Sequence, residues 1–236
     1  MGLNIVVGYL AEQLEYDEEG ASWHRDVLND LNLVLAEAGE APHHEPEEIP
    51  GGSQSWESYG YSGLHHARRL AAWLVINRRL PPPCAYEKAA DDAVLAQFYR
   101  QHEEYLRRGP TKGLLGLFKS RKPPFVHLML HSDAEGFYLP RALPSVIFDQ
   151  HSPQRDGIGG MVGSAEGLLG ECRELAHALS IPLGTDPESE EIYENVEDPP
   201  ADGEPWQRLP IETFVITRLI AACERSLETG AAIVFS

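Results

Sequence analysis

The chain has 236 residues, of which 42% are hydrophobic, 8% aromatic and 24% charged, a composition close to that of an average globular protein. This excludes collagen, a long coiled coil and a fully disordered chain. At about 100 to 200 residues per domain the length allows one large or two small domains, with about 70% of the unfolded surface buried on folding. No stretch approaches the roughly 18 to 20 apolar residues of a spanning helix, so we predict no membrane contact.

The charge is the most unusual bulk property, because 37 Asp and Glu face 19 Lys and Arg and give a net charge of −18. Such an excess repels nucleic acid and anionic membranes and attracts a basic protein or a cation from a distance. The simpler explanation of the charge is solubility alone. The sequence therefore predicts no nucleic-acid partner and leaves a basic protein partner open.

The cysteines indicate a reducing compartment, since Cys84, Cys172 and Cys223 cannot all be paired within one chain. Two of them fall in apolar helical patterns, where a thiol behaves as a small hydrophobe. Val6 stands where a myristoylation signal needs Ser or Thr, and no basic region precedes the apolar run Leu3–Leu10. We therefore expect neither a secretory signal nor a lipid anchor, and a cytoplasmic protein.

The first third of the chain begins with a strand over 3–10, rich in β-branched and aromatic residues. Ser22 is a suitable N-cap for a helix that apolar residues at spacings of three and four carry to Gly39. Residues 40–55 hold three prolines and two adjacent glycines without an apolar period, which predicts an exposed loop.

Two helices are expected next, over 62–77 and 89–108, with three consecutive prolines between them. In the first of these helices, Arg68 and Arg69 lie opposite the apolar face. Residues 109–124 are expected to form an exposed loop. The basic residues of 106–122 come without an acid, so this stretch either docks a phosphate or an acidic surface, or is a mobile loop whose charges offset acids elsewhere.

Residues 125–131 and 137–139 predict an antiparallel hairpin around a loop at 132–136, followed by a strand at 145–148. A helix over 164–179 carries the clearest apolar stripe of the sequence.

The stretch 184–208 is expected to be an exposed loop, and its part 186–204 holds nine acidic side chains, no basic one and three prolines. A helix over 210–229, stopped by Gly230, and a strand over 232–235 complete the chain. Strands and helices mix without strict alternation, so we predict an α+β single domain over 1–236, an antiparallel sheet with helices packed on it.

The predicted hairpin region carries candidate metal ligands. Alternate side chains of a strand share a face, so His127 and His131 should point the same way, with Asp133 in the loop and Asp149 and His151 at the end of the next strand. Two imidazoles and two carboxylates can bind a divalent metal and leave a position open for water. The alternative is that these histidines occupy a solvated face. No other cofactor is expected.

A glycine-rich run over 157–164 precedes the 164–179 helix, and backbone amides at a helix start can hold a phosphate or carboxylate. Gly163 and Ser164 are the candidate anion-binding residues. The run departs from the dinucleotide fingerprint, since Val162 replaces its third glycine. The alternative is an ordinary helix-entry turn capped by Ser164.

Residues 58–65, 131–140 and 163–169 resemble stretches of uncharacterised bacterial proteins, some of immunity-protein type. The resemblance implies a bacterial origin and an interaction role, and it implies no catalytic residues. Our leading hypothesis is thus an acidic cytosolic binding protein that engages a basic protein partner, as an immunity protein does when it blocks a toxic nuclease. The alternative is a metal-dependent hydrolase centred on 127–151.

Overall fold

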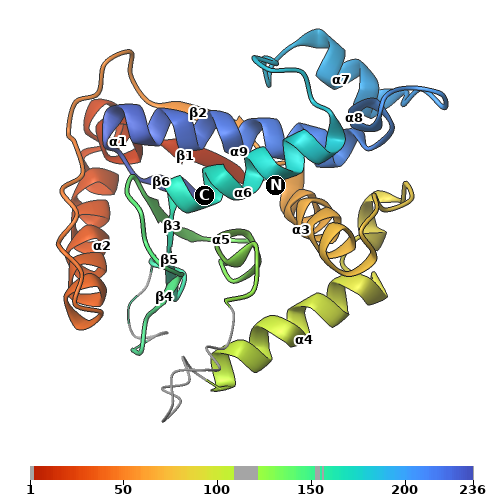
Figure 1. Cartoon of the computed structure of the whole chain (residues 1–236). Coiled ribbons are helices and arrows are strands. Elements are labelled where there is room, and N and C mark those ends of the chain that lie inside the picture. The colour runs from red at the N-terminus through yellow and green to blue at the C-terminus, as the bar shows by residue number, and fades with distance from the viewer. Residues whose placement is uncertain (1–2, 109–121, 152–154, 156, 236) are drawn as a thin grey trace.

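The fold was analysed in a computed structural model that describes residues 3–108, 122–151, 155 and 157–235. In this part of the chain a six-stranded sheet runs through the centre in the order β2-β1-β6-β3-β5-β4 (Figure 1). The strands are β1 (Asn4–Val7), β2 (Gln54–Glu57), β3 (Gly136–Leu139), β4 (Ile147–Phe148), β5 (Met161–Ser164) and β6 (Ile233–Phe235). Neighbouring strands are antiparallel except β3 and β5, which are parallel.

Helices cover both faces of this sheet (Figure 1). The helices are α1 (Tyr9–Tyr16), α2 (Glu18–Glu37), α3 (Gly60–Asn77), α4 (Ala93–Arg108), α5 (Val126–Met129), α6 (Ala165–Leu179), α7 (Glu190–Glu197), α8 (Pro205–Arg208) and α9 (Pro210–Thr229), with a 3₁₀ turn η1 (Tyr86–Lys88). The buried side of α2 packs on one face, and α3, α6 and α9 pack on the other. The predicted α+β class with a mostly antiparallel sheet is confirmed.

The alternation of side chains along the central strands creates the two cores. In β3, Phe137 and Leu139 join the cluster beneath α2, whereas Tyr138 joins the larger cluster beneath α6 and α9. In β6, Val234 faces α2, and Ile233 faces the opposite side. Because both faces are buried, these strands are apolar at successive positions and show no polar alternation.

Local signals explain where the long helices begin and end. The Asp17 side chain accepts a hydrogen bond from the amide of Gly20 at 3.0 Å and caps α2, five residues earlier than the predicted cap at Ser22. Ser164 caps α6 by accepting from the amide of Gly167 at 2.9 Å, and Gly230, with a φ of 79°, ends α9. The predicted helices 62–77, 164–179 and 210–229 are confirmed within a few residues.

The predicted strand over 125–131 is wrong, and with it the predicted hairpin. This run forms the short helix α5, entered through Phe125 with a φ of 60°. Distant side chains hold the turn: Glu171 accepts from the amides of His127 and Leu128, and Arg68 donates to the carbonyls of Leu128 and His131. An apolar run of this length fits a buried helix as well as a strand. The hydrogen bonds with Glu171 and Arg68 favour the helix here.

Other segments also differ from their predictions. The stretch 184–208 contains α7 and α8, and β2 begins at Gln54 within the predicted loop 40–55. The glycine-rich run 157–164 ends in strand β5 instead of a helix-entry turn. Of the predicted loop 109–124, residues 109–121 lie outside the described residues. Among the described helices, none has the length and apolarity needed to cross a bilayer.

Candidate functional site

Three of the predicted metal ligands are engaged in separate ion pairs. Asp133 lies 3.2 Å from Nε2 of His65, and this contact with the nearby charge of Arg68 lowers the pKa of Asp133 to about 2. Asp149 has a buried side chain that accepts from Arg155 at 3.1 Å. His151 is exposed, and its Nε2 lies 3.6 Å from a carboxylate oxygen of Glu37. Asp149 and His151 share one cluster, because Arg155 bridges Asp149 and Glu37 and the amide of His151 donates to Asp149, whereas Asp133 lies in a different one.

The two remaining candidates are buried structural histidines. The Nδ1 atom of His127 accepts from the amide of Ser164 at 3.3 Å, so its lone pair is used internally. His131 stacks on Tyr138 with ring centroids 3.9 Å apart, and its nitrogens lie near the carbonyls of Ser132 and Phe137. Burial lowers the pKa of each histidine to about 4, so both are neutral at pH 7.

These contacts show that the structure does not assemble the predicted metal centre. Within the described ranges, no group of three or more His, Cys, Asp or Glu side chains is placed to hold a metal ion. The prediction depended on a strand over 125–131, in which His127 and His131 would share a face. The helical turn of α5 removes that geometry.

Gly163 and Ser164 are also used within the fold. Gly163 pairs with Tyr138 in the sheet. Ser164 is fully buried, and its hydroxyl donates to the carbonyl of Arg141 at 2.6 Å while it caps α6. Anion binding at these residues stays a prediction, and their hydrogen bonds are accounted for without an anion.

Sequence reasoning missed a buried charge network at the junction of α3 and α9. Glu212 lies 3.2 Å from Nδ1 of His66 and 3.7 Å from Arg69, and the Arg69 side chain donates to Asp92 at 2.7 Å. Arg68 and Arg69 are both 3% exposed, although the helical pattern placed them on the polar face. The spacing of 146 residues between His66 and Glu212 leaves no local signal for this contact. The network joins α3, α9 and Asp92.

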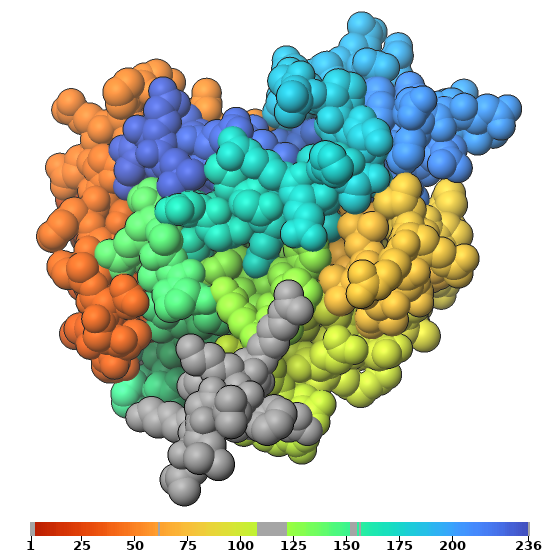
Figure 2. All heavy atoms as spheres, viewed as in Figure 1, coloured from red at the N-terminus to blue at the C-terminus, as the bar shows by residue number. Residues whose placement is uncertain are grey.

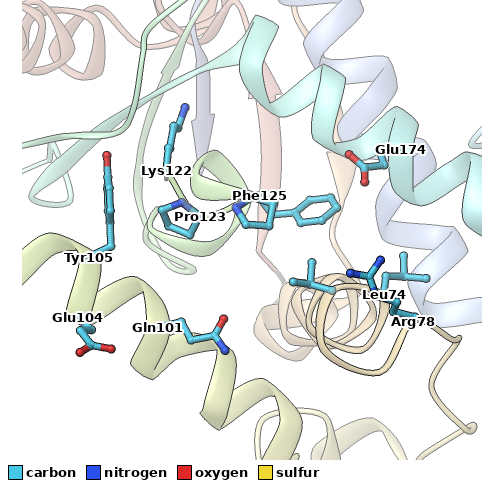
Figure 3. A pocket seen from close by; sticks show the side chains of 11 residues that line it. Leu74, Arg78, Gln101, Glu104, Tyr105, Lys122, Pro123, Phe125 and Glu174 are labelled. Carbon is cyan, nitrogen blue, oxygen red and sulfur yellow. The ribbon is translucent and has the colours of Figure 1, made fainter. Parts of the chain in front are cut away.

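A cavity of about 640 Å³ lies between α3, α4, α6 and residues 122–125 (Figure 3). Its walls mix apolar side chains such as Leu74 and Phe125 with charges of both signs, including Arg78, Lys122 and Glu174. Its described lining contains no Ser, Cys or His, and its titratable groups are Arg78, Glu104, Tyr105, Lys122 and Glu174.

The acidic segment 186–204 forms a raised lobe at the upper right of Figure 2, around α7 and α8. Ile192 and Asn195 of α7 are buried against the body, so the helix is amphipathic. Five acidic side chains lie on its outer side, and we call them the outer row. The outer row consists of Glu190, Glu191, Glu194, Glu197 and Asp198, all exposed. Among the described residues, none of the five has a hydrogen-bonded or ionic partner for its carboxylate.

The spacing of the outer row is close to that of charges along a nucleic-acid strand. With a rise of about 1.5 Å per residue, the five carboxylates span about 12 Å of helix axis, or about one charge per 3 Å. One strand of B-DNA carries one phosphate charge per about 3.4 Å. The outer row therefore has the axial charge density of one DNA strand.

A buried arginine fixes the lobe to the body. Arg218 of α9 is fully buried, and its guanidinium lies 2.8 Å from Glu188 and over the rings of Phe214 and Tyr193 at 3.4 and 5.1 Å. The Thr213 hydroxyl donates to the carbonyl of Trp206 at 2.7 Å and secures the end of the segment. The outer row thus stands on a packed helix and not on a free linker.

Residues 1–235 match the family described as "Putative DNA-mimic protein". The chain belongs to this DNA-mimic family. No curated protein and no solved structure matches the chain.

The family corrects three predictions made from the sequence. The likeness to immunity proteins has no support, because the match over nearly the whole chain is to the DNA-mimic family. The hydrolase hypothesis centred on 127–151 is wrong, since a DNA mimic acts by binding. The prediction that nucleic acid plays no part is also wrong, because a mimic of DNA takes the place of nucleic acid on a DNA-binding protein. Repulsion of DNA itself by a negative charge does not exclude imitation of it.

Proposed function

We propose that the chain occupies the DNA-binding face of a DNA-binding protein and presents the outer row of α7 in place of a phosphate strand. The observation that carries this proposal is the outer row on a packed helix: its charge density is close to that of a DNA strand, and its carboxylates have no partner among the described residues. Arg and Lys side chains that bind phosphates also bind carboxylates through charge-assisted hydrogen bonds. A surface built for DNA therefore finds suitable acceptors on α7.

Acidic side chains elsewhere fit this role less well because many have other partners. Asp17 caps α2 through Gly20, and Glu37 and Glu47 form ion pairs with Arg155 and Arg25. A carboxylate already paired with an arginine offers little charge to a second one. The outer row keeps its full charge and is the preferred contact surface.

The chain is proposed to work in the cytoplasm as one domain over 1–236. A DNA-binding partner is found where the DNA is, and Cys84, Cys172 and Cys223 are all free thiols, which agrees with a reducing compartment. Pairing of β1 with β6 joins the two ends of the chain in one sheet, which supports the single domain.

The test is displacement of host proteins from immobilised duplex DNA. Proteins of the native host are bound to DNA-cellulose at low salt and eluted with the purified chain, and the released proteins are identified by mass spectrometry. We expect selective release of one or a few DNA-binding proteins, with an efficiency that falls as salt rises, because both interactions are electrostatic. If the chain releases nothing at low salt, the proposal is wrong.

Two variants distinguish the effect of the outer row on displacement from the effect of the net charge of the chain. The first replaces four glutamates of the outer row by glutamine: Glu190→Gln, Glu191→Gln, Glu194→Gln and Glu197→Gln. The matched control makes the same change of four charges at exposed glutamates elsewhere: Glu15→Gln, Glu48→Gln, Glu87→Gln and Glu103→Gln. We expect the first variant to need at least tenfold more protein for equal release, and the control to elute like the parent chain. Equal losses in both would assign the effect to net charge alone.

A further inference from the structure

An apolar groove lies directly beside the acidic lobe, between α6 and α9, which run side by side in Figure 1. It encloses about 760 Å³, within the range of about 300 to 1,000 Å³ typical of ligand pockets. Its apolar lining comes from α6, α9 and the connecting loop that leads to Asp186. The apolar lining residues are Ala176, Ile181, Pro182, Leu183 and Ile220.

One of these residues is unusually exposed. Leu183 is 103% exposed, the highest value among the exposed large apolar side chains of the described chain. A single exposed leucine is ordinary on a protein surface, but Leu183 stands at the edge of a groove that carries further apolar residues. The charged lining residues Arg173 and Glu224 pair with each other at 2.9 Å, so they add little net charge. The groove thus combines its apolar residues with the polar residues His177, Ser180, Thr185 and Thr217, at the foot of a strongly negative lobe.

We propose that this groove receives an apolar side chain, aromatic or branched, that projects from the basic surface of the protein partner. The inference rests on the proposed function and adds the partner's chemistry: a cationic surface with one apolar residue within reach of the outer row. Loop 181–185 leads straight into Asp186 and Glu188, so one partner surface can contact the groove and the lobe together. A second copy of this chain is disfavoured as the occupant, because its net charge of −18 repels an identical molecule.

The groove gives the mimic an advantage that a phosphate strand lacks. Contacts between carboxylates and basic side chains weaken as salt rises, in the same way as contacts to DNA. Burial of an apolar side chain does not depend on salt in this manner. The groove therefore lets the chain keep its partner at salt concentrations that release DNA.

The test uses two synthetic probes that differ at one position. One is a short lysine-rich helical peptide with a single central tryptophan, and the other has serine in place of that tryptophan. Affinities are measured by anisotropy of a terminal dye at several salt concentrations, and burial of the tryptophan by the blue shift of its emission. Leu183→Ser tests the groove without a folding cost, since this side chain is fully exposed. Leu33→Ser, at an exposed leucine of α2, is the matched control.

We expect the tryptophan peptide to bind about tenfold tighter than the serine peptide, with a blue shift, and Leu183→Ser to abolish this difference. Leu33→Ser should leave it intact. The glutamine variant of the outer row should weaken both peptides and flatten their salt dependence. If both peptides bind equally and Leu183→Ser changes nothing, the groove proposal is overturned while the proposed function stands. If the outer-row variant also has no effect, the proposed function fails as well. A salt-resistant dimer of the chain that Leu183→Ser dissociates would assign the groove to a second copy and overturn the proposal.

Discussion

Arg218→Met tests whether the acidic lobe depends on its buried anchor. Methionine keeps an apolar stem of similar length, so the change removes the guanidinium with little loss of packing. What is lost is the ion pair to Glu188 at 2.8 Å and the two ring contacts with Phe214 and Tyr193. The contacts with Glu188 and Tyr193 join α9 to the lobe, whereas Phe214 lies in α9 itself, so the effect should be concentrated in the lobe.

The structure sets the size of the effect. The Glu188 side chain is 50% exposed, so its ion pair with Arg218 is worth only about 0–1 kcal/mol. Cation–π contacts contribute about 0.5–2 kcal/mol each when they are shielded from water. Against these gains stands the desolvation of the guanidinium, which lowers the pKa of Arg218. We expect a net loss of about 1–3 kcal/mol in the attachment of the lobe.

Limited proteolysis with a protease that cuts after glutamate measures this attachment directly. Easier opening by about 1–3 kcal/mol raises the cleavage rate within 186–204 at least about fivefold, while cleavage elsewhere changes little. Arg173→Met is the control, because the Arg173–Glu224 pair is exposed on both sides and should be worth less than about 1 kcal/mol. Unchanged cleavage of Arg218→Met, or a uniform increase along the whole chain, would refute this account of the anchor.

Two further variants test the buried histidines and arginines. Burial lowers the pKa of His24 from 6.5 to about 4, so between these values the unfolded chain binds a proton that the fold rejects, and stability falls as pH falls. His24→Phe keeps an aromatic ring against Phe137 and removes this loss, so its stability relative to the parent chain should rise by up to about 1.4 kcal/mol per pH unit below 6.5. Urea unfolding at pH 7 and pH 5 checks this, and an equal difference at both pH values would contradict it. Arg68→Met leaves the buried carbonyl of Leu128 without its donor and should lower the free energy of unfolding by about 3–5 kcal/mol. The exposed control Arg25→Met should lower it by less than about 1 kcal/mol in the same unfolding assay.

The parts of the fold that could be predicted are those decided by near neighbours in the sequence. Helices α6 and α9 were predicted from their apolar stripes together with a local end signal. Ser164 marks the start of α6, and Gly230 marks the end of α9. Helix α5 was missed because its amides and carbonyls are held by Glu171 and Arg68, which lie about 40 and 60 residues away in sequence. No window of local sequence contains those partners.

The candidate site shows the same division. The sequence identified 186–204 as an acidic segment, yet its prolines and charges predicted an exposed loop. The helix was visible in the spacing of Ile192 and Val196 opposite the acids that follow Ser189. The buried position of Arg218 beneath the segment could not be predicted from the sequence. Its ion pair with Glu188 holds the acidic segment against the body. The metal hypothesis failed because it placed His127 and His131 on one face of a strand, whereas these residues lie in and after a helical turn.

The position of Arg218 reconciles two demands that oppose each other on an acidic helix. Five carboxylates within about 12 Å repel one another and favour release of α7 from the body, so a positive charge nearby is needed to hold the segment. The same charge on the outer surface would pair with the outer row and remove the feature that resembles a phosphate strand. Arg218 lies on the inner side instead, between the rings of Phe214 and Tyr193, and its ionic partner is Glu188 outside the outer row. The lobe is thereby held from beneath while the five outer carboxylates keep their charge for a partner.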